Sequence, residues 1–428
     1  MSNKDNLKTE PLIKNQTSIS SPIFTHRTKN QILYIDLNSC FATIEQQSRP
    51  LLRYKPVAIT NRLVNNSCII TASYEAKAKG VKVGTRRAEA ITLCPGIIFI
   101  ESEPSKYFYV HRKFRNILSD YSDKVTMKSI DEGLIDLSGA PISKSRSAKS
   151  IAQEIKTRLK EEIGCYMRCN VGIASNRFLA KLAAGLHKPD GLDEITENNL
   201  LSVYSTLKLL DLPGINTRLE KRLNSVGIFT PIDFYQASEE TLVKMVFKSI
   251  DGHKWHQRLR GIEVDNVNYD IKTVGRQYVL ESRQLTSEEV EKRLLHLSED
   301  AGYRMRSKGL YARGVRIWAY YYDGSSQKEG HISQTAFNAD KTIIAIVKQL
   351  YKRLHHGIRI IGVTLYKLQT DPPELSLFYR EAQKIEHISQ ATDAINKRFG
   401  ERSIHSAATL GTENVKAKVP FGSTRYFG

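Results

Sequence analysis

Three acidic residues beside apolar segments are the strongest candidates for chemistry in this chain. Asp36 ends the apolar run QILYIDL, and Asp131 and Glu132 are adjacent within SIDEGLIDL. A carboxylate next to a buried strand is costly unless it is paired or binds a metal ion. Three such carboxylates are the minimum set for holding two hard divalent cations about 4 Å apart, the arrangement that clamps the attacking and leaving oxygens of a phosphoryl transfer.

The same acids also have an ordinary interpretation. Asp36 could cap a helix, and Asp131 and Glu132 could form a surface turn. Adjacent residues of a strand point to opposite faces, so Asp131 and Glu132 can serve one site only at a twist or turn. Gly133, directly after them, makes such a turn feasible. Each acid alone favours the ordinary interpretation, whereas the three together with the basic segments below favour a metal site.

Charge and cysteine content narrow the class of protein. The 428 residues carry a formal net charge of +19, which indicates a polyanionic partner, with nucleic acid ahead of an anionic membrane. The sequence has no apolar run of about 18 residues and no apolar signal segment near its start, so we expect no membrane partner. Five scattered cysteines argue against a disulfide framework and for a reducing cytosol, hence a cytoplasmic protein.

Hydrophobic periodicity predicts an α+β fold in the first half of the chain. The expected strands are 31–37, 56–60, 67–73 and 169–175, with a strand, a tight turn and a strand in 129–139. Residues 39–47 are expected to start a helix, and further helices are expected at 74–84, 105–122, 143–164 and 176–191.

The expected secondary structure changes twice in the second half of the chain. Residues 195–262 have the pattern of short helices, and the polar stretch 263–272 is typical of a linker. A β-α-β-β-α-β unit then follows, with little regular structure expected after residue 372. Its expected elements are 273–280, 287–308, 310–322, 329–337, 340–356 and 358–369.

Four stretches resemble the signature motifs of the Y-family DNA polymerases, in the order and spacing of that family. They are YIDLNSCFATIE (34–45), TASYEAKAKGVKVG (71–84), SIDEGLIDL (129–137) and VGIASNRFLAKLAAGLHKPDG (171–191). With the helical segment and the C-terminal β-α-β-β-α-β unit, the resemblance spans about residues 30 to 410. It implies a right-hand polymerase with a ferredoxin-like palm, small fingers, a helix-hairpin-helix thumb and a split βαβ little finger.

The resemblance also implies limits for the domains. They are a disordered leader at 1–28, a palm at 29–39 and 103–194, fingers at 40–102, a thumb at 195–262, a linker at 263–272, a little finger at 273–372 and a C-terminal tail at 373–428.

Roles for individual residues follow from the resemblance as well. Asp36, Asp131 and Glu132 match the catalytic, metal-binding acids, and the main-chain carbonyl of Leu37 matches a further metal ligand. The implied cofactor is Mg²⁺, as two ions, with Mn²⁺ as a substitute. Phe41 matches the steric gate against a ribose 2′-hydroxyl. The residues that match the nucleotide-binding set are Phe41, Thr71, Tyr74, Lys77 and Lys188.

Several of these residues have plainer interpretations, and some depart from the family pattern. Phe41 could be core, Tyr74 a packing residue, and Lys188 a cation at a helix C-terminus. Lys77 stands where arginine is usual, which keeps the charge but loses the bidentate fork. Asn38 replaces a common aspartate, a change expected to matter little because the ligand there is the backbone.

Two basic regions are candidates for binding DNA. The turn LPGI (212–215), with Gly214 and the nearby Arg218, is expected between two helices and has the pattern of a hairpin that presents N–H groups to a phosphate. Arg313 and Arg316 lie in an aromatic-rich strand that suits a nucleic acid backbone. The ordinary interpretations are a simple turn and a solvated face.

The function expected from the resemblance is a template-directed DNA polymerase that adds dNTPs to a primer 3′-hydroxyl, with low-fidelity translesion synthesis in DNA repair. One alternative is a catalytically weak or inactive relative that scaffolds replication proteins on DNA, although all three acids are present. A nucleotidyl cyclase fits less well, because cyclases lack a hairpin thumb and a basic C-terminal unit. The expected partners are primer-template DNA, dNTPs and a sliding clamp, with the protein itself a monomer.

Overall fold

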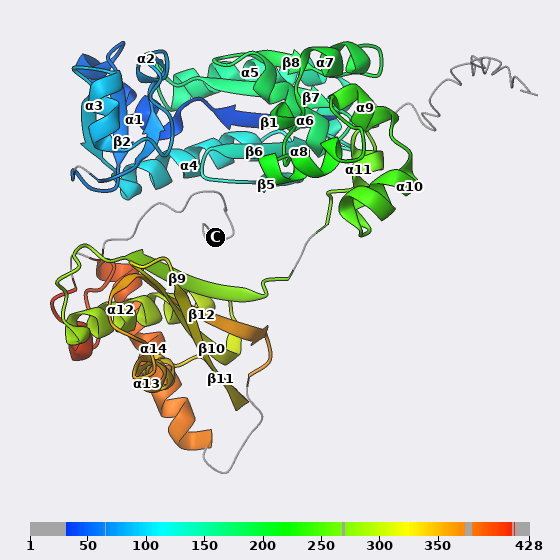
Figure 1. Cartoon of the computed structure of the whole chain (residues 1–428). Coiled ribbons are helices and arrows are strands. Elements are labelled where there is room, and N and C mark those ends of the chain that lie inside the picture. Colours follow the sequence, from blue (N-terminus) through cyan, green and yellow to red (C-terminus); the bar gives the residue numbers. More distant parts are fainter. Residues whose placement is uncertain (1–30, 65, 268–269, 373–378, 413–414, 416–428) are drawn as a thin grey trace, which may run out of the picture. The chain divides into compact units, whose positions relative to one another are not determined.

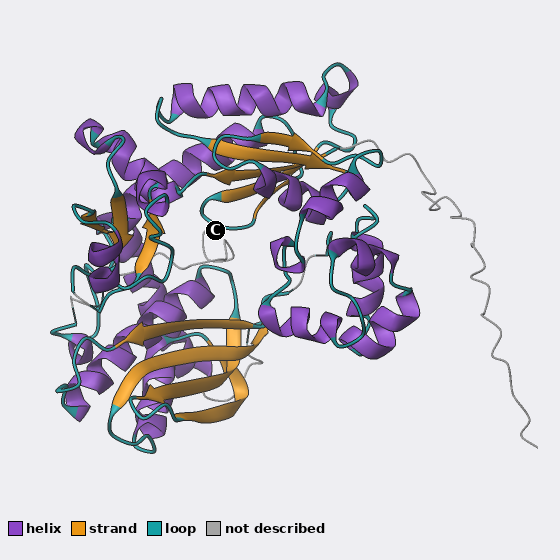
Figure 2. Ribbon diagram, turned by 45° about the horizontal axis from the view of Figure 1, so that its top comes forward, coloured by secondary structure: helices purple, strands orange, loops and turns teal. Residues whose placement is uncertain are grey.

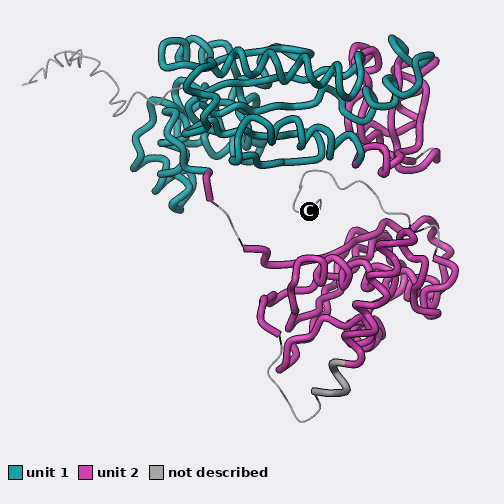
Figure 3. The backbone as a smooth tube through the Cα atoms, turned by 180° about the vertical axis from the view of Figure 1, so that it is seen from behind, with its two compact units in different colours: residues 1–55, 109–265 teal, residues 56–108, 266–428 magenta. Residues whose placement is uncertain are grey.

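The computed structural model of the chain describes residues 31–64, 66–267, 270–372, 379–412 and 415. The leader predicted for 1–28 lies outside the described residues. The chain divides into two compact units (Figure 3). Unit 1 combines residues 1–55 and 109–265, and unit 2 combines residues 56–108 and 266–428.

Unit 1 is built on a five-stranded sheet in the order β5-β6-β1-β7-β8 (Figure 1). Its strands are β1 (Ile32–Leu37), β5 (Val125–Met127), β6 (Glu132–Asp136), β7 (Cys169–Ala174) and β8 (Leu192–Glu194). β1 lies at the centre and pairs antiparallel with both β6 and β7. It is buried along its length except at Asp36, as expected for an apolar run that has neighbours on both sides.

Helices cover both faces of this sheet. α6 (Arg177–Leu186) lies on one face and α4 (Pro104–Ser119) on the other, while α5 (Ala148–Glu162) packs against β7. α1 (Cys40–Ser48) follows β1 in the chain. α6 packs so closely on β7 that a Cβ added to Gly172 would lie 2.0 Å from the carbonyl oxygen of Ala180. On the opposite face, α4 packs against Gly133 of β6 through Leu118 and Phe114.

A helical region completes unit 1 and shares a hydrophobic core with α6. Its helices are α7 (Leu200–Thr206), α8 (Thr217–Asn224), α9 (Pro231–Gln236), α10 (Glu239–Thr241) and α11 (Asp251–Arg258). Trp255 of α11 joins the two parts, because its ring lies 5.4 Å from the rings of both Phe178 of α6 and Phe234 of α9. The thumb-like helices are therefore anchored to the helix that covers the sheet.

Unit 2 contains two sheets. The first, in the order β3-β2-β4, consists of β2 (Val57–Thr60), β3 (Ile69–Ala72) and β4 (Ile98–Glu101), with helices α2 (Tyr74–Lys77) and α3 (Arg87–Leu93). The second, in the order β11-β10-β12-β9, consists of β9 (Thr273–Val279), β10 (Tyr311–Tyr321), β11 (Ser326–Phe337) and β12 (Ile358–Gln369). Helices α12 (Ser287–Arg306) and α13 (Asp340–Tyr351) cover one of its faces, which confirms the predicted β-α-β-β-α-β order (Figure 2).

Three expectations about helices were wrong. The helix expected at 74–84 ends at Lys77, and Gly80 and Gly84 both follow with positive φ. The helix expected at 143–164 begins only at Ala148, where Ser147 accepts a hydrogen bond from the N–H of Ser150. In the thumb-like region, the turn at 212–215 follows a single 3₁₀ turn (Leu209–Asp211) rather than a helix.

A further error concerns the segment after residue 372, which contains the long helix α14 (Tyr379–Phe399). The buried Arg306 of α12 binds Asp393 of α14 and Asp340 of α13, so an ion-pair network attaches this helix to the little-finger-like sheet domain. The burial of these charged groups is not recognisable in the sequence, because Arg and Asp are ordinarily exposed.

Gly172→Ala is expected to lower the free energy of unfolding by about 3 kcal/mol or more, because the new methyl group would overlap backbone atoms of α6 that cannot move away. Gly185→Ala, on α6 itself, is the matched control. Outside the backbone of that helix, a Cβ at Gly185 meets no atom within 4 Å, and alanine is more favourable than glycine in a helix by about 0.5–1 kcal/mol. Denaturant unfolding measures both, and equal stabilities for the two variants would contradict the close packing of β7 and α6.

Candidate active site

The three candidate acids gather at one end of the sheet in unit 1. Asp36 of β1 lies opposite Glu132 of β6 in the strand register, so the two side chains project from the same face. Asp131 lies in a bend just before β6, and its carbonyl oxygen accepts a hydrogen bond of 2.9 Å from the N–H of Leu37. The bend frees Asp131 from the strict alternation of the strand.

Gly133 contributes to this arrangement in a different way from the one expected. It has no positive φ, so it makes no tight turn after the acids. A Cβ at this position would lie 2.4 Å from Cδ1 of Leu118, and the glycine is therefore required for α4 to pack closely under β6.

Two lysines provide the counter-charges for this cluster. Nζ of Lys188 donates to Oδ2 of Asp36. Nζ of Lys181, on α6, donates to Oε1 of Glu132 at 2.9 Å and to the hydroxyl of Tyr34 at 2.9 Å. Lys181 and Tyr34 were not among the residues expected at the site, although the two-residue period of a strand places Tyr34 on the same face as Asp36.

Burial and mutual repulsion raise the pKa values of Asp36 and Asp131. Burial raises the pKa of Asp36, against the opposing effect of Lys188. The pKa of Asp131 is raised to about 6 by burial, with smaller contributions from Asp36 and Glu132 and with the Ser129 hydroxyl acting in the opposite direction. Burial and Glu132 also raise the pKa of Tyr34, which therefore stays protonated. Each carboxylate in this cluster would gain from a further nearby positive charge.

The donor set fits a hard divalent cation, because the candidate side-chain ligands are all carboxylate oxygens. Within the described parts of the chain, no three acidic, histidine or cysteine side chains converge closely enough to hold an ion as they stand. Asp36 and Glu132 are instead engaged by Lys188 and Lys181. Binding of a metal ion to these acids would therefore be coupled to release of the lysines.

The candidate nucleotide-binding residues are divided between the two units. Phe41 lies in the first turn of α1, is buried, and follows Ser39, whose φ of 45° makes the sharp exit from β1. Unit 1 thus contains Phe41, Leu37 and Lys188 together with the acids. Thr71 lies on β3 of unit 2, and Nζ of Lys77 is 4.7 Å from the ring centre of Tyr74 on α2.

The candidate DNA-binding residues are also on both units. Gly214 has a φ of 91° and lies against Trp255, while Asn216 caps α8 by accepting hydrogen bonds from the N–H groups of Arg218 and Leu219. The side chain of Arg218 is exposed.

In unit 2, Nε of Arg313 donates to the carbonyl of Ser333 at 3.3 Å. The exposed Arg316 lies over the ring of Tyr366 at 4.8 Å. Arg316 therefore offers a more available cation than Arg313 does.

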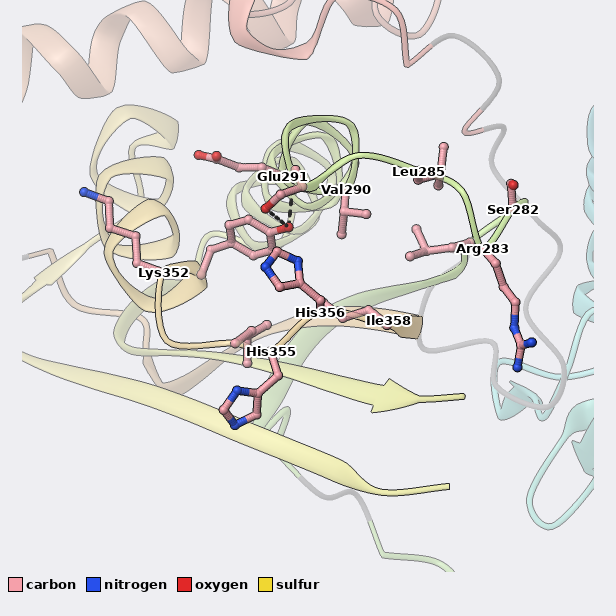
Figure 4. Close-up of a pocket in the computed structure, with 14 residues that line it drawn as sticks. Ser282, Arg283, Leu285, Val290, Glu291, Lys352, His355, His356 and Ile358 are labelled. Atoms are coloured by element: carbon pink, nitrogen blue, oxygen red, sulfur yellow. Dashed lines mark hydrogen bonds between the residues drawn. The ribbon is translucent and has the colours of Figure 1, made fainter. Parts of the chain in front are cut away.

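A cavity in unit 2 has different chemistry from the acid cluster (Figure 4). It lies among β9, α12, α13 and β12, and its lining includes Arg283, Lys352 and His356, with Glu291 as the acidic lining residue. A single carboxylate among cations is a poor site for divalent metals, so this cavity does not compete with the acid cluster as a catalytic centre.

Comparison with known proteins agrees with this architecture. The model of the impB/mucB/samB family matches residues 35–185, and the model of the C-terminal domain of that family matches residues 271–377. The DNA polymerase IV of Pelotomaculum thermopropionicum is 32% identical over 387 residues, which cover 89% of this chain and 95% of that protein. The DNA polymerase IV of Moorella thermoacetica is 31% identical over 392 residues, with coverage of 89% and 96%.

Solved structures support the same fold. A Y-family DNA polymerase chimera of Dbh and Dpo4 superimposes with a TM-score of 0.67 at 24% identity, covering 79% of this chain and 99% of that one. The insertion ternary complex of Dbh DNA polymerase gives a TM-score of 0.56 at 22% identity, with coverage of 79% and 99%.

The chain therefore belongs to the Y-family DNA polymerases and is DNA polymerase IV-like within that family. It is a DNA-directed DNA polymerase of the translesion class, and such polymerases depend on a divalent metal ion. These comparisons give no support to the alternative of a non-catalytic scaffold. None of the helices in the described part of the chain is long and apolar enough to cross a membrane.

Asp131→Asn is expected to stabilise the metal-free protein at neutral pH. The pKa of Asp131 is about 6 in the fold against an ordinary 3.8, so the folded protein retains a proton that the unfolded chain releases. The wild type therefore loses stability as the pH rises from 3.8 to about 6, and it remains less stable above that range.

The gain from Asp131→Asn should amount to at most about 3 kcal/mol at about pH 7.5 with a chelator, and most of it should vanish near pH 4. Thermal melts of the two proteins at both pH values measure this difference. A variant that melts no higher than the wild type at the upper pH would show that the ionised Asp131 carboxylate does not destabilise the fold.

Proposed function

We propose that Asp36, Asp131 and Glu132 bind two Mg²⁺ ions and that this site adds dNTPs to a primer 3′-hydroxyl, with Mn²⁺ as a substitute. The observation that carries the proposal is the pairing of Asp36 with Glu132 across β1 and β6, with Asp131 in the adjoining bend. The main-chain carbonyl of Leu37 would be a further ligand. Bound metal ions would increase the acidity of the 3′-hydroxyl and neutralise charge on the triphosphate.

Lys188 would pair first with Asp36 and then with the triphosphate. In the described structure it neutralises Asp36. When Asp36 serves as a metal ligand, the metal ion would balance its charge, and the amine of Lys188 would become available to the triphosphate. A long lysine side chain that is 38% exposed can change partner in this way at little cost.

The remaining nucleotide contacts are assigned to both units. Phe41 at the start of α1 would collide with a ribose 2′-hydroxyl and so select deoxynucleotides. Thr71, Tyr74 and Lys77 of unit 2 would hold the triphosphate through hydroxyl groups and a cation. The contact of Lys77 with the Tyr74 ring supports joint action of these two residues.

Primer-template DNA is the partner that the charge of +19 supports. The hairpin at Gly214, Arg218, and the strand that carries Arg313 and Arg316 would contact the phosphate backbone without reading sequence. A sliding clamp, a monomeric state and a cytoplasmic location complete the proposal. The cytoplasmic location is supported by the five cysteines, all of them described and all free.

Primer extension tests the catalytic assignment. On an undamaged and on an abasic template, the wild type should extend the primer with Mg²⁺, and Asp131→Ala combined with Glu132→Ala should abolish extension. Loss of metal ligands typically costs about a thousandfold or more in rate. Asp123→Ala, which removes an exposed acid away from the cluster, should retain full activity. Extension by the double variant at the wild-type rate would refute the assignment.

Arg316→Ala is expected to weaken DNA binding equally on different sequences. Loss of one phosphate contact should also reduce the slope of log affinity against log salt by about 1. Arg353→Ala is the control, because Arg353 is exposed and already lies 3.6 Å from Glu329. Fluorescence anisotropy across a salt series measures both slopes, and an unchanged slope for Arg316→Ala would argue against its contact with DNA.

A further inference from the structure

The turn from His187 to Gly191 carries Lys188 and is fixed on both sides of that residue. On one side, Nδ2 of Asn170 donates to the carbonyl of His187 at 2.9 Å. On the other side, Oδ1 of Asn38 accepts a hydrogen bond of 2.8 Å from the N–H of Asp190. The turn is also tight, because a Cβ at Gly191 would lie 2.2 Å from the carbonyl oxygen of His187.

Asn38 connects this turn to the strand that carries Asp36. Its side chain is 2% exposed, and its Nδ2 donates to Oδ1 of Asn170 at 2.9 Å while its Oδ1 serves Asp190. Oδ1 of Asn170 needs a hydrogen-bond donor, whereas the N–H of Asp190 needs an acceptor. A carboxylate would supply only the acceptor, which gives a physical reason for an asparagine here.

Lys156 of α5 secures the turn from a third element. Its Nζ donates to the carbonyl oxygens of Cys169 at 3.1 Å and Gly191 at 3.1 Å, and also to that of Asp190. It lies 2.9 Å from Oδ1 of Asp190 as well. The Lys156 side chain is 13% exposed, and a buried ammonium group with this many partners is directional and strong.

We infer that Asn38, Asn170 and Lys156 form a positioning clamp that holds the 187–191 turn and so directs Lys188 at the nucleotide. The clamp acts through Lys188 and touches neither the metal ions nor the substrate. It rests on the role proposed above for Lys188. Each clamp residue comes from a different element, so the turn stays in place while the Lys188 amine exchanges Asp36 for a triphosphate.

The test is single-nucleotide insertion kinetics in a double-mutant cycle. Asn38→Ala and Lys156→Met should each raise the KM for dNTP roughly tenfold, the effect of losing a buried hydrogen bond, with a much smaller change in kcat. Lys160→Met is the matched control, because Lys160 is on the same helix and reaches only the outer oxygen of the Asp190 carboxylate, at 3.1 Å. Its KM should match the wild type.

The decisive comparison repeats these substitutions in a Lys188→Ala background, where they should add no further rise in KM. A rise as large as in the wild-type background would overturn the clamp, because Asn38 and Lys156 would then act independently of Lys188. An unchanged KM for Lys188→Ala itself would overturn the nucleotide role of Lys188 and the clamp with it, so the two failures are distinguishable. If Asn38→Ala does not fold, Lys156→Met alone carries the comparison, with the same expectations.

Discussion

The balance of charge between the buried acids and the lysines that pair with them is the interaction on which the acid cluster of unit 1 depends. Asp36 and Asp131 occupy positions where burial disfavours their ionised forms. Lys188 and Lys181 offset part of that cost by pairing with Asp36 and Glu132. A protein selected for stability alone would have no need of three acids here. Burial of these acids instead favours added positive charge nearby, which divalent cations would supply.

The fold provides the rigid frame that this balance needs. β1 is fixed between β6 and β7, so Asp36 and Glu132 cannot separate without loss of strand pairing. α6 lies directly on β7 at Gly172, which holds Lys181 above the sheet. The core around Trp255 then joins α6 to the thumb-like helices. The position of one lysine is thereby tied to the packing of the whole unit.

Much of this could be predicted from the sequence, because apolar periodicity and glycine-rich boundaries define β1, β7, α6 and the elements from β9 to β12. The three acids were identifiable because each adjoins an apolar run. Lys181 was missed because a lysine on a helix ordinarily faces solvent, and only the approach of α6 to β6 brings it to Glu132. Asn38 was expected to matter little because the metal ligand there is the backbone. Its side-chain partners, Asn170 and Asp190, could not be predicted because they are far along the chain. The ion pairs that attach α14 at Asp393 could not be predicted, because charge patterns do not reveal burial.

Direct counting of bound metal ions tests the central claim. Electron paramagnetic resonance of free Mn²⁺ can be followed during titration of the enzyme, with primer-template DNA that has a 3′-deoxy end and the matching dNTP. The wild type should bind two ions per complex, and Asp131→Asn should bind fewer under the same conditions. Equal binding by the wild type and the variant would show that the acids at the end of β1 and β6 do not hold the metal ions.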